Sequence, residues 1–233
     1  MIVLLFLLQF SIANAITIED FTKHTEFYNV KISPDGKHLA ALINTNGRKT
    51  LTFLDAKTYK VTYALVGEEQ DQVGNYYWAN NERVVVEVEQ VRGSLEQPLN
   101  YGEIFAVNYD GTRSAMLFGY RAKNKTFQWG KIIDLYDESD KHILLYTARG
   151  QGHFGQEVVP NVQKLNIYSG KLSKVGRAPE PDSQFLLDND GKVRFAASVD
   201  EDYIQRLFYK EKRKDKWQEF GSNFKGTFQP IAF

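Results

Sequence analysis

The chain contains no cysteine among its 233 residues, and it has only 4 histidines, 2 methionines and 6 prolines. The absence of cysteine excludes a disulfide framework, a thiolate metal site and a cysteine nucleophile, but it does not identify the compartment, because many exported proteins lack disulfides. An excess of charge of one sign is missing as well, since Lys plus Arg and Asp plus Glu both total 29. No broad electrostatic field therefore favours nucleic acid or an anionic membrane, and we expect no nucleic-acid partner.

Long hydrophobic runs are confined to the N-terminus. Residues 1–10 are almost wholly apolar, and residues 11–15 read Ser-Ile-Ala-Asn-Ala, which ends in the A-x-A pattern that signal peptidase reads. We therefore predict a signal peptide over residues 1–15 and a periplasmic or secreted protein, although no Lys or Arg precedes the run. A transmembrane helix needs about 20 apolar residues, so we expect no stable membrane insertion after cleavage. An N-terminal membrane anchor or a buried strand is the alternative.

The rest of the chain has the composition of a globular protein, with 42% hydrophobic and 25% charged residues. Aromatic residues make up 14%, and such side chains pack well on strands. Residues 17–20 fit a helix capping box, so residues 16–25 are predicted to form a short segment before the main domain. Thereafter short runs of alternating or β-branched residues are separated by Gly, Asn, Asp and Pro, which predicts an all-β protein.

A unit of four short strands repeats within residues 26–233. In the first unit the pattern predicts strands at residues 28–32, 38–43, 51–55 and 61–65. The residues that close the first turn of each unit recur at intervals of roughly 50 residues, about the length of one four-stranded propeller blade. These residues are Lys37, Arg83, Lys141 and Lys192. The predicted blades span residues 26–66, 73–119, 129–177 and 182–222. Their remaining strands are predicted at residues 75–78, 83–91, 103–109, 114–118, 131–135, 141–148, 162–168, 172–175, 184–187, 193–199, 203–210 and 217–220.

Residues 227–233 have the pattern of one further strand. Propellers typically close 4 to 8 blades into a ring, because an open array leaves a strand edge and a blade face without partners. The predicted fold is therefore an all-β partial β-propeller, with about four four-stranded antiparallel blades plus the first strand of a fifth. A closed four-bladed ring, in which the last strand pairs with the first blade, is the alternative.

The first hairpin carries a resemblance to known families. This hairpin consists of a predicted strand, the turn Ser33-Pro34-Asp35-Gly36-Lys37 and a second predicted strand. It resembles the inner hairpin of the propeller repeat shared by TolB-like proteins and the prolyl oligopeptidase family of serine peptidases. Residues 188–192 keep the Asp-Gly-Lys end of this motif, while residues 79–83 and 137–141 are degenerate. Asp and Gly supply the capped corner of a tight hairpin, so the motif marks a fold and not a function.

The features around the repeat look like those of the exported dipeptidyl-aminopeptidase and acylaminoacyl-peptidase branch of the peptidase family. TolB-like proteins place an α/β domain before the propeller, for which residues 16–25 leave no room. The resemblance implies the substrate-gating and scaffold part of an exported serine peptidase, with a C-terminal α/β-hydrolase domain in the same protein and peptide substrates as partners. No Gly-x-Ser-x-Gly nucleophile motif occurs in the sequence, so we predict no catalytic residue. A non-enzymatic periplasmic TolB-like propeller that binds protein or envelope partners is the alternative.

Two patterns that could suggest a cofactor or a metal do not have the required context. Residues 150–155 match G-x-G-x-x-G, but Pro160 prevents a long helix and no acidic residue follows at the required spacing. We predict no cofactor there, and Arg149 to Gly155 is instead a candidate for interdomain or substrate contact. No metal site is predicted, because the histidines lack the spacing of zinc ligands. They are His24, His38, His142 and His153.

Three polar stretches are expected to lie on the surface. The charge runs at residues 68–71 and 211–216 fall between predicted strands, and we expect both to be solvated turns. Neither run has the interleaved aromatic residues of a single-stranded nucleic-acid platform. Residues 124–126 read Asn-Lys-Thr, a glycosylation sequon that has meaning only in a eukaryotic secretory pathway.

Overall fold

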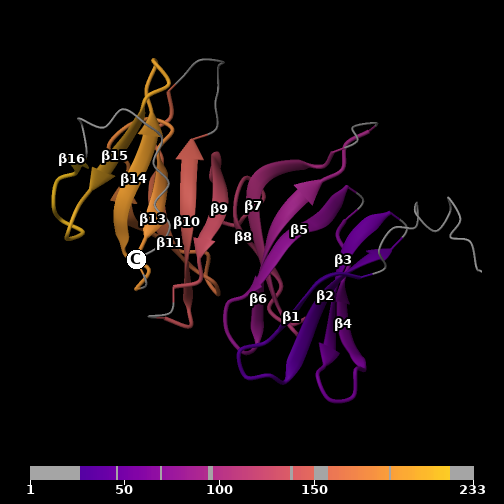
Figure 1. Cartoon of the computed structure of the whole chain (residues 1–233). Coiled ribbons are helices and arrows are strands. Elements are labelled where there is room, and N and C mark those ends of the chain that lie inside the picture. The colour runs from indigo at the N-terminus through magenta and orange to yellow at the C-terminus, as the bar shows by residue number, and fades with distance from the viewer. Residues whose placement is uncertain are drawn as a thin grey trace, which may run out of the picture.

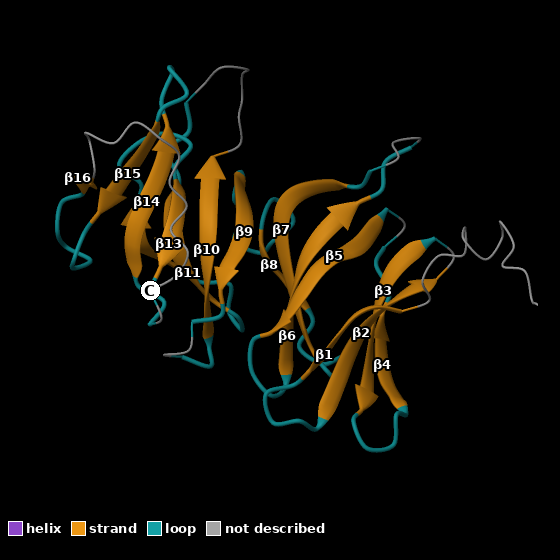
Figure 2. Cartoon of the chain, in the orientation of Figure 1, coloured by secondary structure: helices purple, strands orange, loops and turns teal. Residues whose placement is uncertain are grey.

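The computed structural model describes residues 27–45, 47–68, 70–93, 97–136, 139–149, 157–188 and 190–220. Within these ranges every regular element is a β-strand (Figure 2), and no helix is present that could cross a membrane. The strands are β1 (Phe27–Ile32), β2 (His38–Thr45), β3 (Arg48–Asp55), β4 (Val61–Leu65), β5 (Asp71–Trp78), β6 (Arg83–Gln90), β7 (Leu99–Asn108), β8 (Ala115–Phe118), β9 (Gln128–Asp134), β10 (His142–Arg149), β11 (Asn161–Asn166), β12 (Leu172–Arg177), β13 (Gln184–Leu187), β14 (Val193–Val199), β15 (Gln205–Tyr209) and β16 (Gln218–Phe220).

The strands form four antiparallel sheets, each made of four strands that are consecutive in the chain. The sheets stand side by side in chain order, from β1–β4 at one end to β13–β16 at the other (Figure 1). This architecture is the predicted all-β partial propeller, and we number the sheets as blades one to four. Because the first and fourth blades lie at opposite ends of the row, the described residues do not form a closed four-bladed ring. The signal-peptide and fifth-strand predictions, for residues 1–15 and 227–233, lie outside the described residues.

All sixteen predicted strands are present, and the largest differences in their bounds occur in blade two. β5 begins at Asp71 instead of residue 75, because the ladder with β6 continues through a bulge between Val73 and Asn75. β7 begins at Leu99 instead of residue 103, and a second bulge interrupts its register with β6 between Val88 and Glu89. A bulge inserts an extra residue and breaks the alternation of side chains, so the sequence pattern ends before the hydrogen-bonded strand does.

The hydrophobic core lies between neighbouring blades. Blade two shows why, because β6 carries Val84, Val86 and Val88 on one face and Val85 on the other, and all four are buried. The first three belong to the cluster with Leu51 of blade one, whereas Val85 packs in the cluster shared with blade three. A strand that is covered on both faces loses the simple alternation of apolar and polar residues. The continuous Val-Val-Val run of β6 is a consequence of this packing.

Two polar side chains connect blades within these clusters. Tyr76 of blade two is fully buried, and its hydroxyl lies 2.6 Å from the carbonyl oxygen of Ala40 in blade one. Arg83 is 1% exposed and donates from Nε to the carbonyl oxygen of Ile167 in blade three at 2.7 Å. Its Nη1 donates to Oδ1 of Asn108 at 2.9 Å. The turn-closing position of blade two therefore carries a cation whose hydrogen bonds hold blades two and three together.

The two ends of the blades differ in the segments that they carry. One end, here the hairpin face, carries the turns between the first and second strands and between the third and fourth strands of each blade, for example β1–β2, β3–β4, β13–β14 and β15–β16. The other end, the loop face, carries the connections β2–β3, β6–β7, β10–β11 and β14–β15 together with the segments that join one blade to the next. In Figure 1 the β6–β7 connection lies toward the upper edge of the molecule. A ligand or partner can therefore contact either face without meeting the other.

The Ser33–Lys37 turn on the hairpin face has the capped geometry that its motif predicts. Gly36 has a φ of 74°, a conformation that glycine adopts without the penalty of a Cβ. The Asp35 carboxylate accepts hydrogen bonds from the Ser33 hydroxyl at 2.8 Å and from the Lys37 amide at 3.2 Å. These bonds, with that from Ser33 the largest cause, lower the pKa of Asp35 to about 2. The motif is explained by turn chemistry, and it needs no ligand.

Candidate functional site

The loop face carries a groove between blades two and three, of about 530 Å³, that is lined by aromatic side chains. We call it the aromatic groove. Its walls come from β7, from the connection between β8 and β9, and from the start of β9. The large side chains in its walls are Tyr101, Tyr120, Phe127 and Trp129. Three of them are exposed: Tyr101 by 45%, Tyr120 by 57% and Phe127 by 78%. A cluster of exposed large aromatic side chains is typical of a binding surface, because isolated exposed residues are common but clusters are not.

The aromatic side chains also contact one another and nearby cations. The rings of Tyr120 and Phe127 lie 5.4 Å apart, and Nε1 of Trp129 donates to the carbonyl oxygen of Asn100 at 3.2 Å. The guanidinium of Arg92 lies 5.3 Å from the centre of the Tyr101 ring. The ammonium of Lys125 lies 5.3 Å from that of Tyr120. Each cation is attracted to an aromatic face, so positive charge accompanies the apolar surface of the groove.

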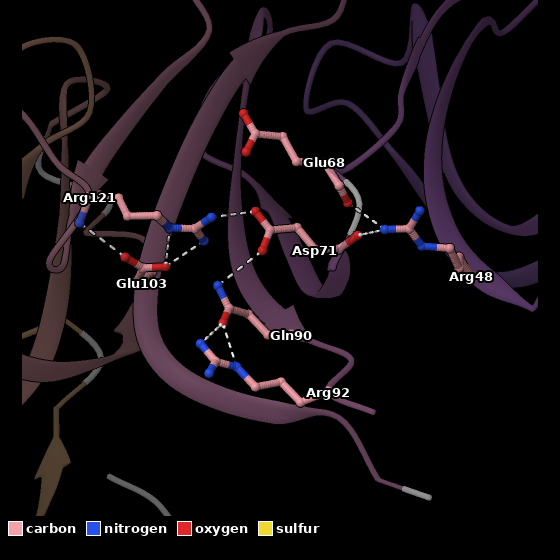
Figure 3. Close-up of polar contacts among 7 residues, drawn as sticks. All are labelled: Arg48, Glu68, Asp71, Gln90, Arg92, Glu103 and Arg121. Carbon is pink, nitrogen blue, oxygen red and sulfur yellow. Dashed lines mark hydrogen bonds and ion pairs between the residues drawn. The ribbon is translucent and has the colours of Figure 1, made fainter. Parts of the chain in front are cut away.

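A network of charged side chains supports the floor of the groove (Figure 3). Arg121 lies on the β8–β9 connection, which crosses the loop face of blade two. Its Nε donates to Oε2 of Glu103 at 2.7 Å, and its Nη1 donates to Oδ2 of Asp71 at 2.6 Å. Asp71 also accepts from Nε2 of Gln90 at 3.1 Å, and Gln90 in turn accepts from Nη2 of Arg92 at 3.0 Å. These hydrogen bonds connect β5, β6, β7 and the β8–β9 connection under the groove.

Arg121 supplies the positive charge at the centre of this network. The hydrogen bonds to Glu103, and then those to Asp71, raise the pKa of Arg121 above its ordinary value. The Glu103 side chain is only 5% exposed, and such a buried carboxylate needs a partner of this kind. Both oxygens of Glu103 accept from Arg121, one from its side chain and one from its backbone amide at 3.1 Å. Arg121 is thus held as a fixed element of the groove floor.

Two glycines allow blades two and three to approach closely enough to form the groove. A Cβ at Gly102, where φ is 74°, would lie 2.2 Å from the backbone nitrogen of Gly130 on β9. A Cβ at Gly130 would lie 2.5 Å from the Phe118 ring. No ordinary Cβ contact is that short, so both positions require glycine. The contact places Tyr101 of β7 beside Trp129 of β9, in neighbouring walls of one groove.

The predicted contact loop is only partly visible. Arg149 ends β10 on the loop face and is exposed, and residues 150–155, with the G-x-G-x-x-G pattern, lie outside the described residues. Among the histidines, His38 stacks on Tyr109 with ring centres 3.7 Å apart, and His142 hydrogen bonds with Ser139 at 2.9 Å. His24 and His153 lie outside the described residues. Within the described ranges no three His, Cys, Asp or Glu side chains form a metal-binding group.

The prediction for residues 68–71 is wrong at Asp71, which is not part of a solvated turn, whereas Glu68 and Gln70 are exposed as expected. Asp71 is the first residue of β5, and its side chain is only 13% exposed. Tertiary packing explains this burial, because the β8–β9 connection places Arg121 against Asp71. The two residues are 50 positions apart in the chain. The second run, residues 211–216, is exposed as expected. The sequon residue Asn124 is also exposed, on the β8–β9 connection.

Sequence reasoning did not find the aromatic groove. Its side chains come from three separate segments, residues 90–92, 99–103 and 120–129, and each segment alone resembles an ordinary loop or strand end. A usable signal was present in residues 120–129, where Tyr, Arg, two Lys, Phe and Trp fall outside the predicted strands. Large aromatic residues in a connection are unusual enough to suggest a binding surface.

Comparison with known proteins agrees with the fold and gives no family. No protein-family model and no curated protein matches the chain. Among solved structures, oligogalacturonate lyase from Vibrio parahaemolyticus matches 85% of this chain and 55% of its own, with a TM-score of 0.52 and 12% identity. This chain thus spans about half the length of that enzyme. TolB from Acinetobacter baumannii gives a TM-score of 0.43 at 10% identity, covering 83% of this chain and 43% of TolB.

The tricorn protease is similar as well, with a TM-score of 0.40 at 12% identity over 83% of this chain and 22% of the protease. Of the three proteins, oligogalacturonate lyase has a TM-score above 0.5, and its β-propeller agrees with the four four-stranded antiparallel blades of this chain. At such low identity the likeness shows the fold alone. The class that fold and site define is therefore a β-propeller protein with an aromatic groove on its loop face.

Proposed function

We propose that this chain is a binding propeller, the substrate-gating and scaffold part of an exported serine peptidase, and that its aromatic groove receives an extended polypeptide segment. The single observation that carries the proposal is the groove itself. Tyr, Trp, Phe and Arg are the residues enriched at the energetic centres of protein interfaces. Here the groove combines all four, and its arginines are held in position by hydrogen bonds within blade two.

The charges of the groove indicate which polypeptide it favours. Arg121 is neutralised by Glu103 and Asp71. Arg92 and Lys125 contact aromatic rings, and neither has a carboxylate within ion-pair distance among the described residues. A peptide with carboxylate side chains would supply the missing partners, while its aromatic side chains would stack on Tyr101 or Phe127. We therefore infer a preference for peptides that combine acidic and aromatic residues.

A direct binding measurement tests the groove. A fluorescein-labelled peptide of alternating Glu and Tyr should raise its anisotropy when the full chain is added, and the same peptide with Lys for Glu should bind at least about tenfold more weakly. Arg92→Ala and Phe127→Ala should each weaken binding by about tenfold, because truncation of an interface anchor costs more than about 1 kcal/mol. Lys57→Ala, an exposed change in the β3–β4 turn of the hairpin face, is the matched control and should leave binding unchanged.

Two results would contradict the groove assignment. The first is equal affinity for the Glu-Tyr and Lys-Tyr peptides in wild-type protein. The second is binding that Arg92→Ala and Phe127→Ala do not alter. An acidic oligosaccharide offers a different outcome, since carboxylates and sugar faces also suit arginines and aromatic rings. If an oligogalacturonide competes with the peptide and binds more tightly, the groove recognises carbohydrate, and the peptide proposal is wrong.

The peptidase part of the proposal has its own test. It rests on the resemblance of the Ser33–Lys37 hairpin to the prolyl oligopeptidase repeat, and it predicts a hydrolase domain in the same protein. The coding sequence that follows codon 233 should continue through further blades to a Gly-x-Ser-x-Gly motif. A stop codon at that point, combined with peptide binding in the groove, would favour the alternative of a non-enzymatic envelope propeller. Export is tested by locating the protein in fractionated cells.

A further inference from the structure

A second cavity lies on the hairpin face, between blades three and four, where no motif of the sequence indicates a site. It measures about 420 Å³ and is bounded by the turns β9–β10, β13–β14 and β15–β16. Its charged lining is mostly basic, with Glu211 as the one acidic member. The basic members are Lys164, Lys192, Arg194, Lys210, Lys212 and Arg213. We call it the basic cavity, and it shares no lining residue with the aromatic groove.

Lys210 is the most informative of these side chains. The residue is only 4% exposed, and its ammonium lies 4.3 Å from the centre of the Trp217 ring. No carboxylate lies within ion-pair distance of it among the described residues. The backbone of Gly176 on β12 lies beside the ammonium, since a Cβ there would make an ordinary contact of 3.5 Å with the Lys210 Nζ. Burial, reinforced by the charge of Arg213 and opposed by that of Asp215, lowers the pKa of Lys210.

The other basic side chains fall into two groups. Arg194 and Lys192 are paired with carboxylates, Arg194 with Asp188 at 2.7 Å and Lys192 with Asp190 at 2.8 Å. Lys164 instead lies 3.8 Å from the centre of the Tyr136 ring. Neither it nor the exposed pair formed by Lys212 and Arg213 has a carboxylate within ion-pair distance in the described ranges. Four cations therefore line the cavity without an ion pair among the described residues, and Glu211 is the one carboxylate in the same lining.

A buried ammonium without a carboxylate is unfavourable by itself, because the loss of hydration is not repaid. The arrangement becomes favourable when an anion occupies the cavity. A single carboxylate would neutralise one of the four cations. A phosphate monoester carries a charge of about −1.5 to −2 at pH 7 and presents three strong acceptor oxygens, which suits several converging donors. The volume falls within the range of about 300 to 1,000 Å³ that is usual for small-molecule sites.

We propose that the basic cavity binds the phosphomonoester group of a small organic ligand, with Lys210 as the buried anchor and Arg213, Lys212 and Lys164 as the surrounding donors. The same chemistry is available from a soluble phosphate ester and from the head group of a phosphatidic acid lipid. The site is independent of the aromatic groove, since the two lie on opposite faces of different blade pairs. Failure of either proposal leaves the other standing.

Calorimetric titration of the full chain with glycerol 1-phosphate at constant ionic strength tests the proposal, with glycerol as the uncharged control. Wild-type protein should bind the phosphate ester and not glycerol. Lys210→Met should weaken binding at least about tenfold, since hydrogen bonds from a charged donor are lost. Arg213→Ala, a change in an exposed turn, should weaken it by about threefold or more. Lys171→Met, an exposed lysine on the same face but outside the cavity, should leave affinity within about twofold of wild type.

Thermal melting separates loss of the site from loss of the fold. Lys210→Met removes an unpaired buried charge, so its melting temperature without ligand should equal or exceed that of wild type, whereas the ligand-induced rise should disappear. Vesicles of phosphatidylcholine with and without phosphatidic acid distinguish the two ligand sources. Binding only to phosphatidic acid vesicles, abolished by Lys210→Met, assigns the lipid head group. No binding to either probe overturns the proposal, and so does equal weakening by Lys210→Met and Lys171→Met.

Discussion

Replacement of Tyr76 by Phe tests how neighbouring blades are joined. The Tyr76 side chain is fully buried, and its hydroxyl lies 2.6 Å from the carbonyl oxygen of Ala40 and 2.5 Å from that of Asn29, both in blade one. Burial raises the pKa of Tyr76 far above its usual value, so the hydroxyl keeps its proton and donates throughout the physiological pH range. Tyr76→Phe removes that donor and leaves the ring packing intact, because the ring of Phe has the same shape.

Tyr76→Phe should lower the free energy of unfolding for two reasons. One buried hydrogen bond is lost, and the carbonyl oxygens that accepted it are left facing an apolar ring. A neutral hydrogen bond contributes about 1 kcal/mol net, and an unsatisfied buried acceptor can add to this. We therefore expect a loss of about 1 to 2 kcal/mol in the free energy of unfolding. For a chain of this size that lowers the melting temperature by roughly 2 to 8 °C.

Chemical denaturation and calorimetry of the full chain provide the assay. Tyr59→Phe is the matched control, because Tyr59 is 69% exposed in the β3–β4 turn; it should change the free energy of unfolding by less than about 0.5 kcal/mol. The reasoning is refuted if Tyr76→Phe is no more destabilising than Tyr59→Phe. A changed slope of the free energy of unfolding against denaturant concentration, in only one variant, would instead indicate a change in the unfolded state.

Three further predictions concern other parts of the structure. Gly102→Ala should lower the free energy of unfolding, measured by urea denaturation, by about 2 to 5 kcal/mol. The residue has a positive φ, and the added Cβ would lie 2.2 Å from the backbone nitrogen of Gly130. A loss below about 1 kcal/mol would contradict the close packing. The Asp35 carboxyl should titrate near pH 2 in an NMR titration. Its ionised form therefore stabilises the turn at pH values above the ordinary pKa of 3.8, and this stabilisation is lost as the pH falls toward 2. Ser33→Ala should raise the pKa of Asp35. Amide hydrogen exchange should be faster in β14 than in β6. Among the described residues, the cluster between blades three and four has three buried members, whereas the cluster between blades one and two has eleven. Equal protection of the two strands would contradict this.

The sequence was sufficient to predict the blades because each strand is a local pattern. Strand β4 was predicted with the bounds that the structure gives, Val61–Leu65, and so were β13 and β14. The hairpin turns were equally predictable, since the conformation of Gly36 and the bonds to Asp35 depend on residues only a few positions away. Bulges limited the prediction in blade two, where the alternation of side chains is interrupted at Gly74.

Both candidate sites depend on packing between segments that are distant in the chain. Arg121 lies 50 residues from Asp71, and nothing in either local sequence indicates that they meet. Lys210 reads as an ordinary residue at the end of a strand, and only its burial over Trp217 distinguishes it. Burial and convergence of charge are tertiary properties, so composition and spacing could not identify the aromatic groove or the basic cavity.

The central claim is that the aromatic groove is a polypeptide-binding surface, and hydrogen exchange with bound peptide tests it most directly. Saturation with the peptide of alternating Glu and Tyr should slow exchange at residues 97–103 and 120–129, which form the groove walls. The turn at residues 33–37 on the hairpin face should exchange at its original rate. Protection confined to the hairpin face, or no protection anywhere under saturating peptide, would contradict the claim.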